Sequence, residues 1–398
     1  MISFEKAISI LDAQVGPLDL PAGPVPLAEA MGRVAVGPYA SRVDLPPFDK
    51  SAMDGFAVRA EDDRPGELEV LEVVRAGQVP TVPLRAGAAS KVMTGAAVPE
   101  GTAKVVMVEQ TEQRGGRVRI VETDERTNFC RRGEDVRAGQ VVLRGPRRIG
   151  TAEIANLVSC GVLEVRAARR IRAAILATGD EIVDDPARLG AGKIMNANGP
   201  MLAALCRAHG LEVSCVERVA DDAAATRSAI EAALEAADVL IVTGGVSVGD
   251  FDFVGPALAE AGLTVHYDSV AIKPGRPMTL ATRGAKVALG LPGNPVSVYL
   301  TFHLFVRRAA RRLAGLDADL RVASMTLARG YRRRRTERAA YVPCRLNAGG
   351  MLEPVEYHGS AHLYALLEAD GVFRMERGCG EAAAGQDVPF LRLTGLYG

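Results

Sequence analysis

The chain has 398 residues, of which 48 are basic and 48 acidic, so its formal net charge is zero. A chain of this length is too long for one ordinary core, and two to four domains are expected. The balanced charge argues against nucleic acid or an anionic membrane as a partner. An anionic ligand would therefore have to be bound by a local arrangement of cations and amides. Only seven of the basic residues are lysine, so each lysine in a loop is of interest.

The cysteines and the N-terminus indicate the cellular compartment. The six cysteines are scattered and form no C-x-x-C pair, which favours a reduced chain without a structural zinc site. The first residues lack the basic start and long apolar segment of a signal peptide. No apolar segment is long enough to span a bilayer. We therefore expect a soluble, cytoplasmic protein.

The N-terminal part is expected to combine two helices with a β region. Residues 3–15 predict an amphipathic helix, and residues 26–33 predict a second short helix. Residues 56–146 contain short apolar runs separated by glycine and proline turns, a pattern typical of all-β structure. A further helix is predicted from Thr151, as its cap, to Cys160.

Strands and helices alternate from Ile171 onward. Strands are predicted at residues 171–177, 211–216, 239–242, 278–281 and 286–290, and helices at residues 199–209, 222–237, 253–261 and 295–314. This βαβ alternation predicts a doubly wound parallel sheet. After residue 317 the chain again resembles β-structure, with a hairpin at Gly349–Gly350.

The segment around residues 238–252 is the centre of this α/β region. The apolar run Val239–Val242 fits a strand that is buried on both faces of a parallel sheet. It is followed by residues that suit a ligand-binding loop, namely Thr243, Gly244, Gly245, Ser247, Gly249, Asp250 and Asp252. Ligands of open α/β sheets bind at the carboxyl ends of the strands. Loop N–H groups can hold a phosphate or oxyanion there, with the two aspartates holding a divalent cation beside it.

Two other strand-end loops, residues 178–182 and 291–295, are expected at the same edge of the sheet. In the second, Gly293 and Asn294 lie between Pro292 and Pro295, which gives a stiff bend that opens a helix. The amides of Val296 and Ser297 at that helix start favour an anion.

A fourth loop places Lys273 and Arg276 around a rigid Pro–Gly turn, which suits an oxyanion. Together these loops favour a phosphate-rich ligand. Carboxylates that face phosphate need a cation between them, so Glu181, Asp221, Asp250 and Asp252 indicate Mg²⁺. A helix-capping role for Asp221 is equally open. The His358/His362 pair and the run Arg332–Arg335 are interpreted as solvated surface.

Seven motifs in one order resemble those of a known family. They are Pro47-Phe-Asp-Lys-Ser-Ala-Met-Asp-Gly-Phe-Ala57, Met93-Thr-Gly-Ala-Ala-Val-Pro99, Arg132-Gly-Glu-Asp135, Thr178-Gly-Asp-Glu181, Gly244-Gly-Val-Ser-Val-Gly-Asp-Phe-Asp252, Lys273-Pro-Gly-Arg-Pro277 and Leu291-Pro-Gly-Asn-Pro-Val-Ser297. The chain closely resembles the MoeA-type molybdopterin molybdenumtransferase family, which includes the gephyrin E domain and its plant counterpart. The resemblance covers nearly the whole chain.

The resemblance implies a multidomain α/β and β fold. A doubly wound parallel α/β domain is combined with an inserted all-β domain, an elongated linker domain and a C-terminal β domain. The implied boundaries are residues 1–45 with 144–170 for the linker domain, 46–143 for the inserted domain, 171–316 for the molybdopterin-binding α/β domain and 317–398 for the C-terminal domain.

The resemblance also implies a reaction. Adenylylated molybdopterin and molybdate yield molybdenum cofactor and AMP, assisted by Mg²⁺. Asp221 and Asp252 are the implied metal-binding and diphosphate-cleavage carboxylates. The implied molybdate cradle is Lys273, Arg276, Pro277 and Ser297. Further implied site residues are Asp54, Thr94, Asp135, Glu181, Gly244, Gly245, Ser247, Gly249, Pro292, Gly293, Asn294, Pro295, Arg338 and Ser360.

The family further implies a homodimer whose cleft combines the α/β domain of one chain with the β domain of the other. Transient contacts with other proteins of molybdenum cofactor synthesis are expected, and neither nucleic acid nor membrane is. Arg276 replaces the lysine most common in the family. The positive charge is kept, but a compact ammonium group is exchanged for a planar guanidinium group with several N–H donors. Two alternatives are a molybdopterin adenylyltransferase, which lacks the two β domains, and a gephyrin-like scaffold that binds a peptide.

Overall fold

The structure, a computed structural model, describes residues 1–245 and 253–393. The chain forms two compact units. Unit 1 contains Met1–Gly23, Gly32–Val34 and Ala168–Gly398, and unit 2 contains Pro24–Met31 and Ala35–Ala167. The finer division into four domains stays a prediction.

The main sheet of unit 2 has six strands in the order β8-β5-β7-β6-β10-β9. Their bounds are β5 (Gly55–Val58), β6 (Gly66–Val74), β7 (Ala88–Val92), β8 (Lys104–Met107), β9 (Thr111–Arg114) and β10 (Arg117–Ile120). Alternate side chains of β5 enter different cores: Phe56 packs with Ile120, and Ala57 packs with Phe129. This alternation is what a strand buried on both faces requires. The predicted all-β region is confirmed.

Short elements complete unit 2. The two-residue strands β4 (Lys50–Ser51) and β11 (Phe129–Cys130) pair, as do β3 (Tyr39–Ala40) and β12 (Val141–Leu143), and the 3-10 turns are η2 (Ala60–Asp62) and η3 (Val108–Gln110). A four-stranded sheet has the order β1 (Ala22–Pro26), β14 (Glu164–Ala168), β2 (Val34–Ala35) and β13 (Arg147–Arg148).

Two helix predictions in this part need correction. Residues 26–33 do not form a helix, because only the 3-10 turn η1 (Leu27–Glu29) forms before Gly32 takes a φ of 73°. Helix α2 (Thr151–Ser159) is present, but its N-cap is Gly150 rather than Thr151. Glu153 accepts the hydrogen bond of the Gly150 N–H at 3.1 Å, so an acidic side chain in the first turn satisfies the helix start.

The large sheet of unit 1 has six strands in the order β18-β15-β19-β23-β22-β20. The parallel strands are β18 (Glu212–Val219), β15 (Arg172–Thr178), β19 (Val239–Thr243) and β23 (Lys286–Leu291). The strands β22 (Pro277–Arg283) and β20 (Thr264–Ser269) pair antiparallel, so the predicted doubly wound parallel sheet is present with an antiparallel edge that the sequence did not indicate. Arg283 pairs directly with Lys286, so only two residues connect β22 to β23. A parallel connection would need about a dozen residues, and two suffice only for a hairpin.

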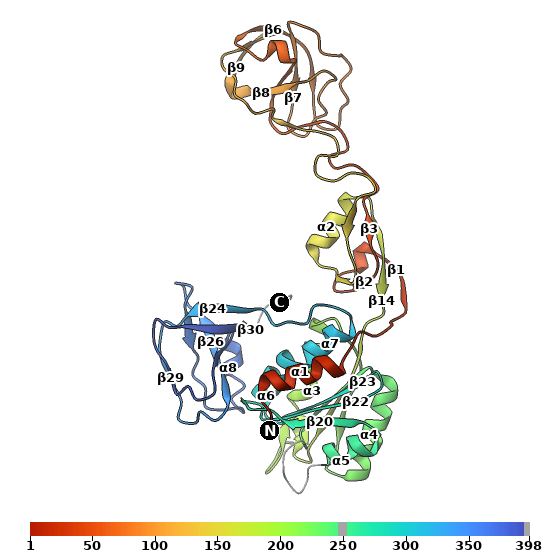
Figure 1. The fold of residues 1–398 in the computed structure, drawn as a ribbon, viewed down its shortest axis with the longest axis vertical. Coiled ribbons are helices and arrows are strands. Elements are labelled where there is room, and N and C mark those ends of the chain that lie inside the picture. The colour runs from red at the N-terminus through yellow and green to blue at the C-terminus, as the bar shows by residue number, and fades with distance from the viewer. Residues whose placement is uncertain (246–252, 394–398) are drawn as a thin grey trace. The chain divides into compact units, whose positions relative to one another are not determined.

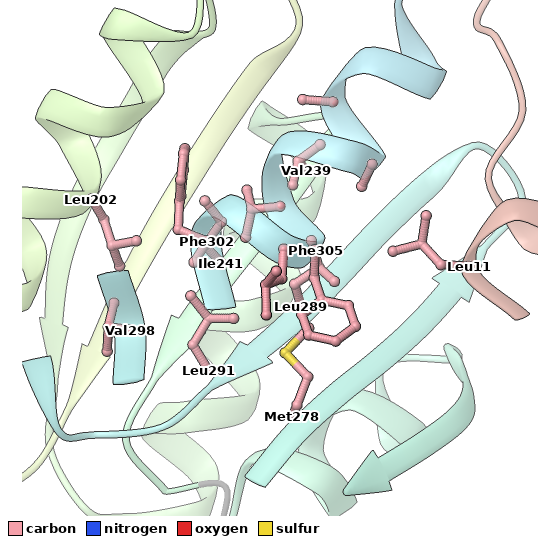
Figure 2. Close-up of a cluster of buried hydrophobic side chains, with 14 of the residues drawn as sticks. Leu11, Leu202, Val239, Ile241, Met278, Leu289, Leu291, Val298, Phe302 and Phe305 are labelled. Carbon is pink, nitrogen blue, oxygen red and sulfur yellow. The ribbon is translucent and has the colours of Figure 1, made fainter. Parts of the chain in front are cut away.

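Helices cover both faces of this sheet (Figure 1). One face carries α1 (Phe4–Gln14), α3 (Asn198–Ala208), α6 (Pro295–Thr301) and α7 (Arg307–Leu313), and the other carries α4 (Ala223–Ala236) and α5 (Val254–Glu260). Figure 2 shows the first core, where Leu11, Leu202 and Phe305 from the helices gather with Ile241 and Leu289 from the strands. The predicted double burial of β19 is confirmed, because Val239–Val242 are at most 1% exposed.

A second sheet of unit 1 is built from the C-terminal region. Its order is β21-β26-β28-β30-β24, and β27 pairs with β26. The bounds are β21 (Ile272–Lys273), β24 (Val322–Thr326), β26 (Ala339–Leu346), β27 (Leu352–Pro354), β28 (Gly371–Met375) and β30 (Asp387–Arg392), with the pair β25 (Tyr331–Arg332) and β29 (Glu381–Ala382) and the short helix α8 (Ala365–Glu368) beside it. The hairpin predicted at Gly349–Gly350 joins β26 to β27 and is confirmed. Strand β21 comes from the α/β part of the chain, so a segment between the strands of the large sheet forms one edge of the second sheet.

The predicted helix over residues 295–314 contains a π-helical segment, η5 (Phe302–Val306), between α6 and α7. His303 in this segment is 5% exposed, and its Nε2 atom has no hydrogen-bond partner among the described residues. Its ring lies 4.8 Å from that of Tyr299 and 5.4 Å from that of His209. Burial, and then the charges of His209 and Arg307, lower the pKa of His303 to about 3.

This buried imidazole is expected to make unit 1 less stable in mild acid. In the unfolded chain the pKa of a histidine is about 6.5, so between that pH and about 3 only the unfolded state binds the proton. Stability therefore decreases as the pH falls through this window, by up to about 1.4 kcal/mol per pH unit, and the loss is absent above it. Urea unfolding of wild type and of His303→Leu between about pH 5 and pH 7 tests this. The variant should show a flatter dependence, whereas His358→Leu, at an exposed histidine, should follow wild type.

Candidate functional site

The three predicted loops start at neighbouring positions of the large sheet. Ala177 of β15 pairs with Thr243 of β19, and Thr243 pairs with Leu291 of β23. Because these strands are parallel, the loops after residues 178, 243 and 291 leave the same edge. The predicted common edge is therefore present.

Gly244 packs directly against the neighbouring loop. A Cβ atom added to Gly244 would lie 2.5 Å from the Thr178 carbonyl oxygen and 2.8 Å from its hydroxyl oxygen, and the φ of Gly244 is 87°. A Cβ atom on Gly245 would lie 3.0 Å from the same hydroxyl oxygen. On the other side, Gly293 would bring a Cβ atom to 3.9 Å from the Gly244 Cα atom. The close approach of the Thr178 backbone thus requires glycine at position 244, whereas the 3.9 Å separation at Gly293 is an ordinary contact. Ser247, Gly249, Asp250 and Asp252 lie outside the described residues.

A buried asparagine that sequence reasoning missed connects these loops. Asn198, the first residue of α3, donates from Nδ2 to Thr243 Oγ1 at 3.1 Å and to the Gly293 carbonyl at 2.7 Å. Thr243 Oγ1 donates in turn to the Pro292 carbonyl at 2.8 Å. In the sequence, the only feature that could have indicated Asn198 is its position, as a polar residue at the start of a helix that follows a strand-end loop.

Acidic residues gather at the ends of β15 and β18. The Asp180 N–H donates to Asp221 Oδ2 at 3.1 Å, and the Asp221 N–H donates to Asp180 Oδ1 at 3.2 Å. The carboxylate of Glu181 folds back over Gly179, where an added Cβ atom would lie 2.6 Å from Glu181 Oε2. The helix-cap alternative for Asp221 is not borne out, because the N-cap of α4 is Asp222. Asp180 is a second missed residue, although it belongs to the motif that contains Glu181.

The described residues do not contain a set of three His, Cys, Asp or Glu side chains placed to hold a metal. Asp221 and Asp180 supply oxygen donors at the loop edge, which is the ligand type that Mg²⁺ prefers. These residues fit a magnesium ion chemically, and Mg²⁺ stays a prediction.

The cationic turn lies at the junction between the two sheets of unit 1. Lys273 of β21 pairs with Ala340 of β26, and the Arg338 guanidinium donates from Nη1 to the Ile272 carbonyl at 3.2 Å. Burial lowers the pKa of Arg338, and the charge of Arg276 lowers it further. Arg338 therefore joins Lys273 and Arg276 in one cationic cluster, with Pro277 starting the adjacent strand β22.

The positive charges of this cluster are not neutralised by carboxylates among the described residues. Within residues 1–245 and 253–393, no ion pair or side-chain hydrogen bond is formed by Lys273 or Arg276. Arg335 also contributes charge that lowers the Arg338 pKa, although sequence reasoning placed it on a solvated edge. Unpaired cations around a buried turn favour an anionic ligand.

The loop before α6 is partly occupied by the chain itself. Pro295 is the first residue of α6, as predicted. The Val296 N–H, however, donates to the Ser360 carbonyl at 3.1 Å, so the prediction that this amide is free for an anion is wrong. Asn294 Nδ2 donates to Ser360 Oγ at 2.8 Å, which brings Ser360 to the loop edge. Ser297 is 2% exposed.

Unit 2 carries its own candidate residues. Asp54 Oδ1 accepts from the Thr94 N–H at 2.6 Å and from the Thr94 hydroxyl at 2.7 Å. These two hydrogen bonds keep the pKa of Asp54 below its ordinary value. Asp54 and Thr94, which lie 40 residues apart in the sequence, are thus brought together in the fold of unit 2, and their role in the site stays a prediction. Asp135 is exposed and, in the part of the chain that the structure describes, its side chain forms no hydrogen bond to either residue.

Comparison with known proteins identifies the family. The chain matches the MoeA N-terminal region (domain I and II) over residues 2–161, a probable molybdopterin binding domain over 174–312 and the MoeA C-terminal region (domain IV) over 326–393. It is 40% identical over 302 residues to the molybdopterin molybdenumtransferase of a Nostoc species, across 73% of this chain and 69% of that protein. The chain belongs to the MoeA family.

Other MoeA relatives extend the match to the rest of the chain. A molybdopterin molybdenumtransferase of Staphylococcus aureus is 31% identical over 382 residues, which are 94% of this chain and 91% of that protein. The crystal structure of a molybdopterin biosynthesis MoeA protein from Pyrococcus horikoshii has a TM-score of 0.83 at 27% identity, over 98% of this chain and all of that one. The multidomain α/β and β fold is that of MoeA proteins. No helix of the described residues is long and apolar enough to cross a membrane.

Proposed function

We propose that this chain is a molybdopterin molybdenumtransferase, which converts adenylylated molybdopterin and molybdate into molybdenum cofactor and AMP. The names of its relatives support this reaction. The observation that carries the proposal is the shared edge, where the loops after β15, β19 and β23 meet. A glycine loop with close backbone approach suits a phosphate group, and the unpaired cations Lys273 and Arg276 suit a second anion.

In this proposal different residues of the chain bind molybdate, the phosphate-bearing substrate and the magnesium ion. Lys273, Arg276 and Arg338 attract the molybdate anion and hold it in place before reaction, so that little reorganisation is needed afterwards. The backbone of Gly244 and Gly245 lets the phosphate-bearing substrate approach closely. Asp221, with Asp180 beside it and Asp252 outside the described residues, would hold Mg²⁺. A bound magnesium ion would supply positive charge against the diphosphate.

The test is a single-turnover assay of AMP release. Purified protein is mixed with adenylylated molybdopterin and Mg²⁺, and AMP is measured by chromatography before and after molybdate is added. We expect about one AMP per active site, dependent on molybdate. Chelation of the metal with EDTA should suppress the release, and excess Mg²⁺ should restore it. The absence of molybdate-dependent AMP would contradict the proposed function, whereas AMP release that resists EDTA would contradict only the magnesium proposal.

The same mixture separates the alternatives. An adenylyltransferase would consume ATP and molybdopterin and would produce adenylylated molybdopterin rather than AMP. The matches to the MoeA N- and C-terminal regions, which lie outside the α/β domain, favour the insertion reaction over this one. A pure scaffold would bind without turnover.

A homodimer and a cytoplasmic location also belong to the proposal, and both stay predictions. The protomer mass is 42.0 kDa. Light scattering of the purified protein should therefore give twice this mass if the dimer is correct. Transient contacts with other proteins of cofactor synthesis are expected on the same basis.

A further inference from the structure

We propose that Asn198 is a positioning residue that fixes the peptide between Gly293 and Asn294, so that the Asn294 N–H faces the phosphate-bearing substrate. The inference rests on the proposed function and adds a residue outside the motifs that suggested it. Asn198 lies at the start of α3 and is 7% exposed. It acts through the neighbouring loops and not by contact with the substrate.

The hydrogen bonds of Asn198 determine how its amide is oriented. A carbonyl oxygen can only accept, so the 2.7 Å contact with the Gly293 carbonyl requires the NH₂ group of Asn198. The second proton of this group goes to Thr243 Oγ1, whose own proton goes to the Pro292 carbonyl. Thr243 is 1% exposed, so water does not compete. The network thus ties the ends of β19 and β23 to one side chain.

A hydrogen bond that fixes the direction of the Gly293 carbonyl also fixes the direction of the Asn294 N–H, because both belong to the same planar peptide. In a planar trans peptide the C=O and N–H groups point in opposite directions. With the Gly293 carbonyl turned toward Asn198, the Asn294 N–H points away from it. This N–H has no hydrogen-bond partner in the described ranges 1–245 and 253–393. A fixed, unpaired amide beside the glycine loop is a preorganised donor for an anionic oxygen.

Two features indicate that this arrangement serves positioning more than stability. Asn198 Oδ1 is buried and has no hydrogen-bond partner among the described residues. A buried acceptor without a partner destabilises the fold, so stability alone does not account for an asparagine at this position. Gly293 lacks a Cβ atom, so its ψ angle, which orients the following peptide, is less restricted than in other residues even between the two prolines. The hydrogen bond from Asn198 to the Gly293 carbonyl supplies a restraint on that angle.

The test compares Asn198→Ala with Asn196→Ala. Asn196 lies near the same end of α3, and among the described residues it makes two side-chain hydrogen bonds, with Asp184 and with the Gly199 N–H, but none with residues 244–245 or 292–294. We expect Asn198→Ala to raise the KM for adenylylated molybdopterin about tenfold, which corresponds to one lost hydrogen bond to a charged group. Its KM for molybdate should stay within about twofold of wild type, and Asn196→Ala should change neither KM.

A double-mutant cycle with Thr243→Val tests the network. Because Thr243 acts through the same hydrogen bonds, Asn198→Ala/Thr243→Val should bind adenylylated molybdopterin no more weakly than Asn198→Ala alone. Thermal unfolding checks that each variant is folded. If Asn198→Ala does not fold, Thr243→Val should show the same selective rise in KM, and its absence would overturn the inference.

The outcomes distinguish this inference from the proposed function. A wild-type protein that releases no AMP contradicts the function. A wild type that turns over, together with an Asn198→Ala variant that matches it, or one that raises both KM values equally, overturns the positioning role alone.

Discussion

Replacing Gly244 by alanine is expected to lower molybdate-dependent AMP release on the order of 10²-fold. The added Cβ atom would lie 2.5 Å from the Thr178 carbonyl oxygen, which belongs to the backbone of β15 and has little freedom to move. The positive φ of 87° adds roughly 1–3 kcal/mol of strain for a residue with a side chain. The loop after β19 must shift, and a misplaced binding group of this kind costs about 10²-fold in rate.

The matched control for this substitution is Gly284→Ala. Gly284 also has a positive φ, 56°, but a Cβ atom there meets nothing within 4 Å. It lies between β22 and β23, at the end of the sheet away from the candidate site. Both variants should melt at lower temperatures than wild type, and only Gly244→Ala should lose turnover. Equal activity of the two variants would show that the close contact with Thr178 has no role in the reaction.

Replacing Lys273 by methionine is also expected to reduce turnover on the order of 10²-fold. The substitution keeps the apolar stem and removes the charge, and the loss of one donor to a developing or bound oxyanion has an effect of this size. Lys273 lies beside Arg276 and Arg338 and has no carboxylate partner within the described residues. Its charge is therefore available to molybdate. Steady-state assays should assign the loss to molybdate, through a raised KM or a lower kcat.

Lys286→Met removes the same charge at the opposite end of the sheet. The Lys286 ammonium donates to the Ala237 carbonyl at 2.8 Å, so this control also loses one hydrogen bond. It should retain nearly full turnover. Binding of adenylylated molybdopterin without molybdate, measured by calorimetry, should be similar for both variants. If Lys273→Met weakens the binding of both substrates equally, a selective role in holding molybdate is wrong.

Sequence patterns predict most elements of the α/β region, because burial leaves a strong signal there. The run Val239–Val242 and the helix from Ala223 to Ala236 are both present where the pattern places them. Apolar periodicity does not report strand direction, however. The reversal of β22 depends on the two residues between Arg283 and Lys286, and only their small number indicates a hairpin.

The candidate site was harder to predict, because hydrogen bonding across the fold decides which groups remain available. Proline and glycine predict the stiff loop before α6, but nothing local indicates that Ser360 occupies the Val296 amide. Asn198 is a single asparagine in an ordinary helix start, and its role depends on acceptors at residues 243 and 293. The grouping of Arg338 with Lys273 similarly requires the pairing of β21 with β26.

The pairing of β21 with the C-terminal sheet has a consequence for how this protein can be shortened. Ile272 and Lys273 lie about two thirds of the way along the chain, yet they form the edge of a sheet made otherwise from residues after 321. Deleting residues 322–398 would remove the backbone partners of the residue that carries the proposed molybdate contact, and would also uncover the amide now covered by Ser360. The C-terminal sheet is thus expected to hold Lys273 in place, and a chain shortened before it should lose the proposed molybdate contact.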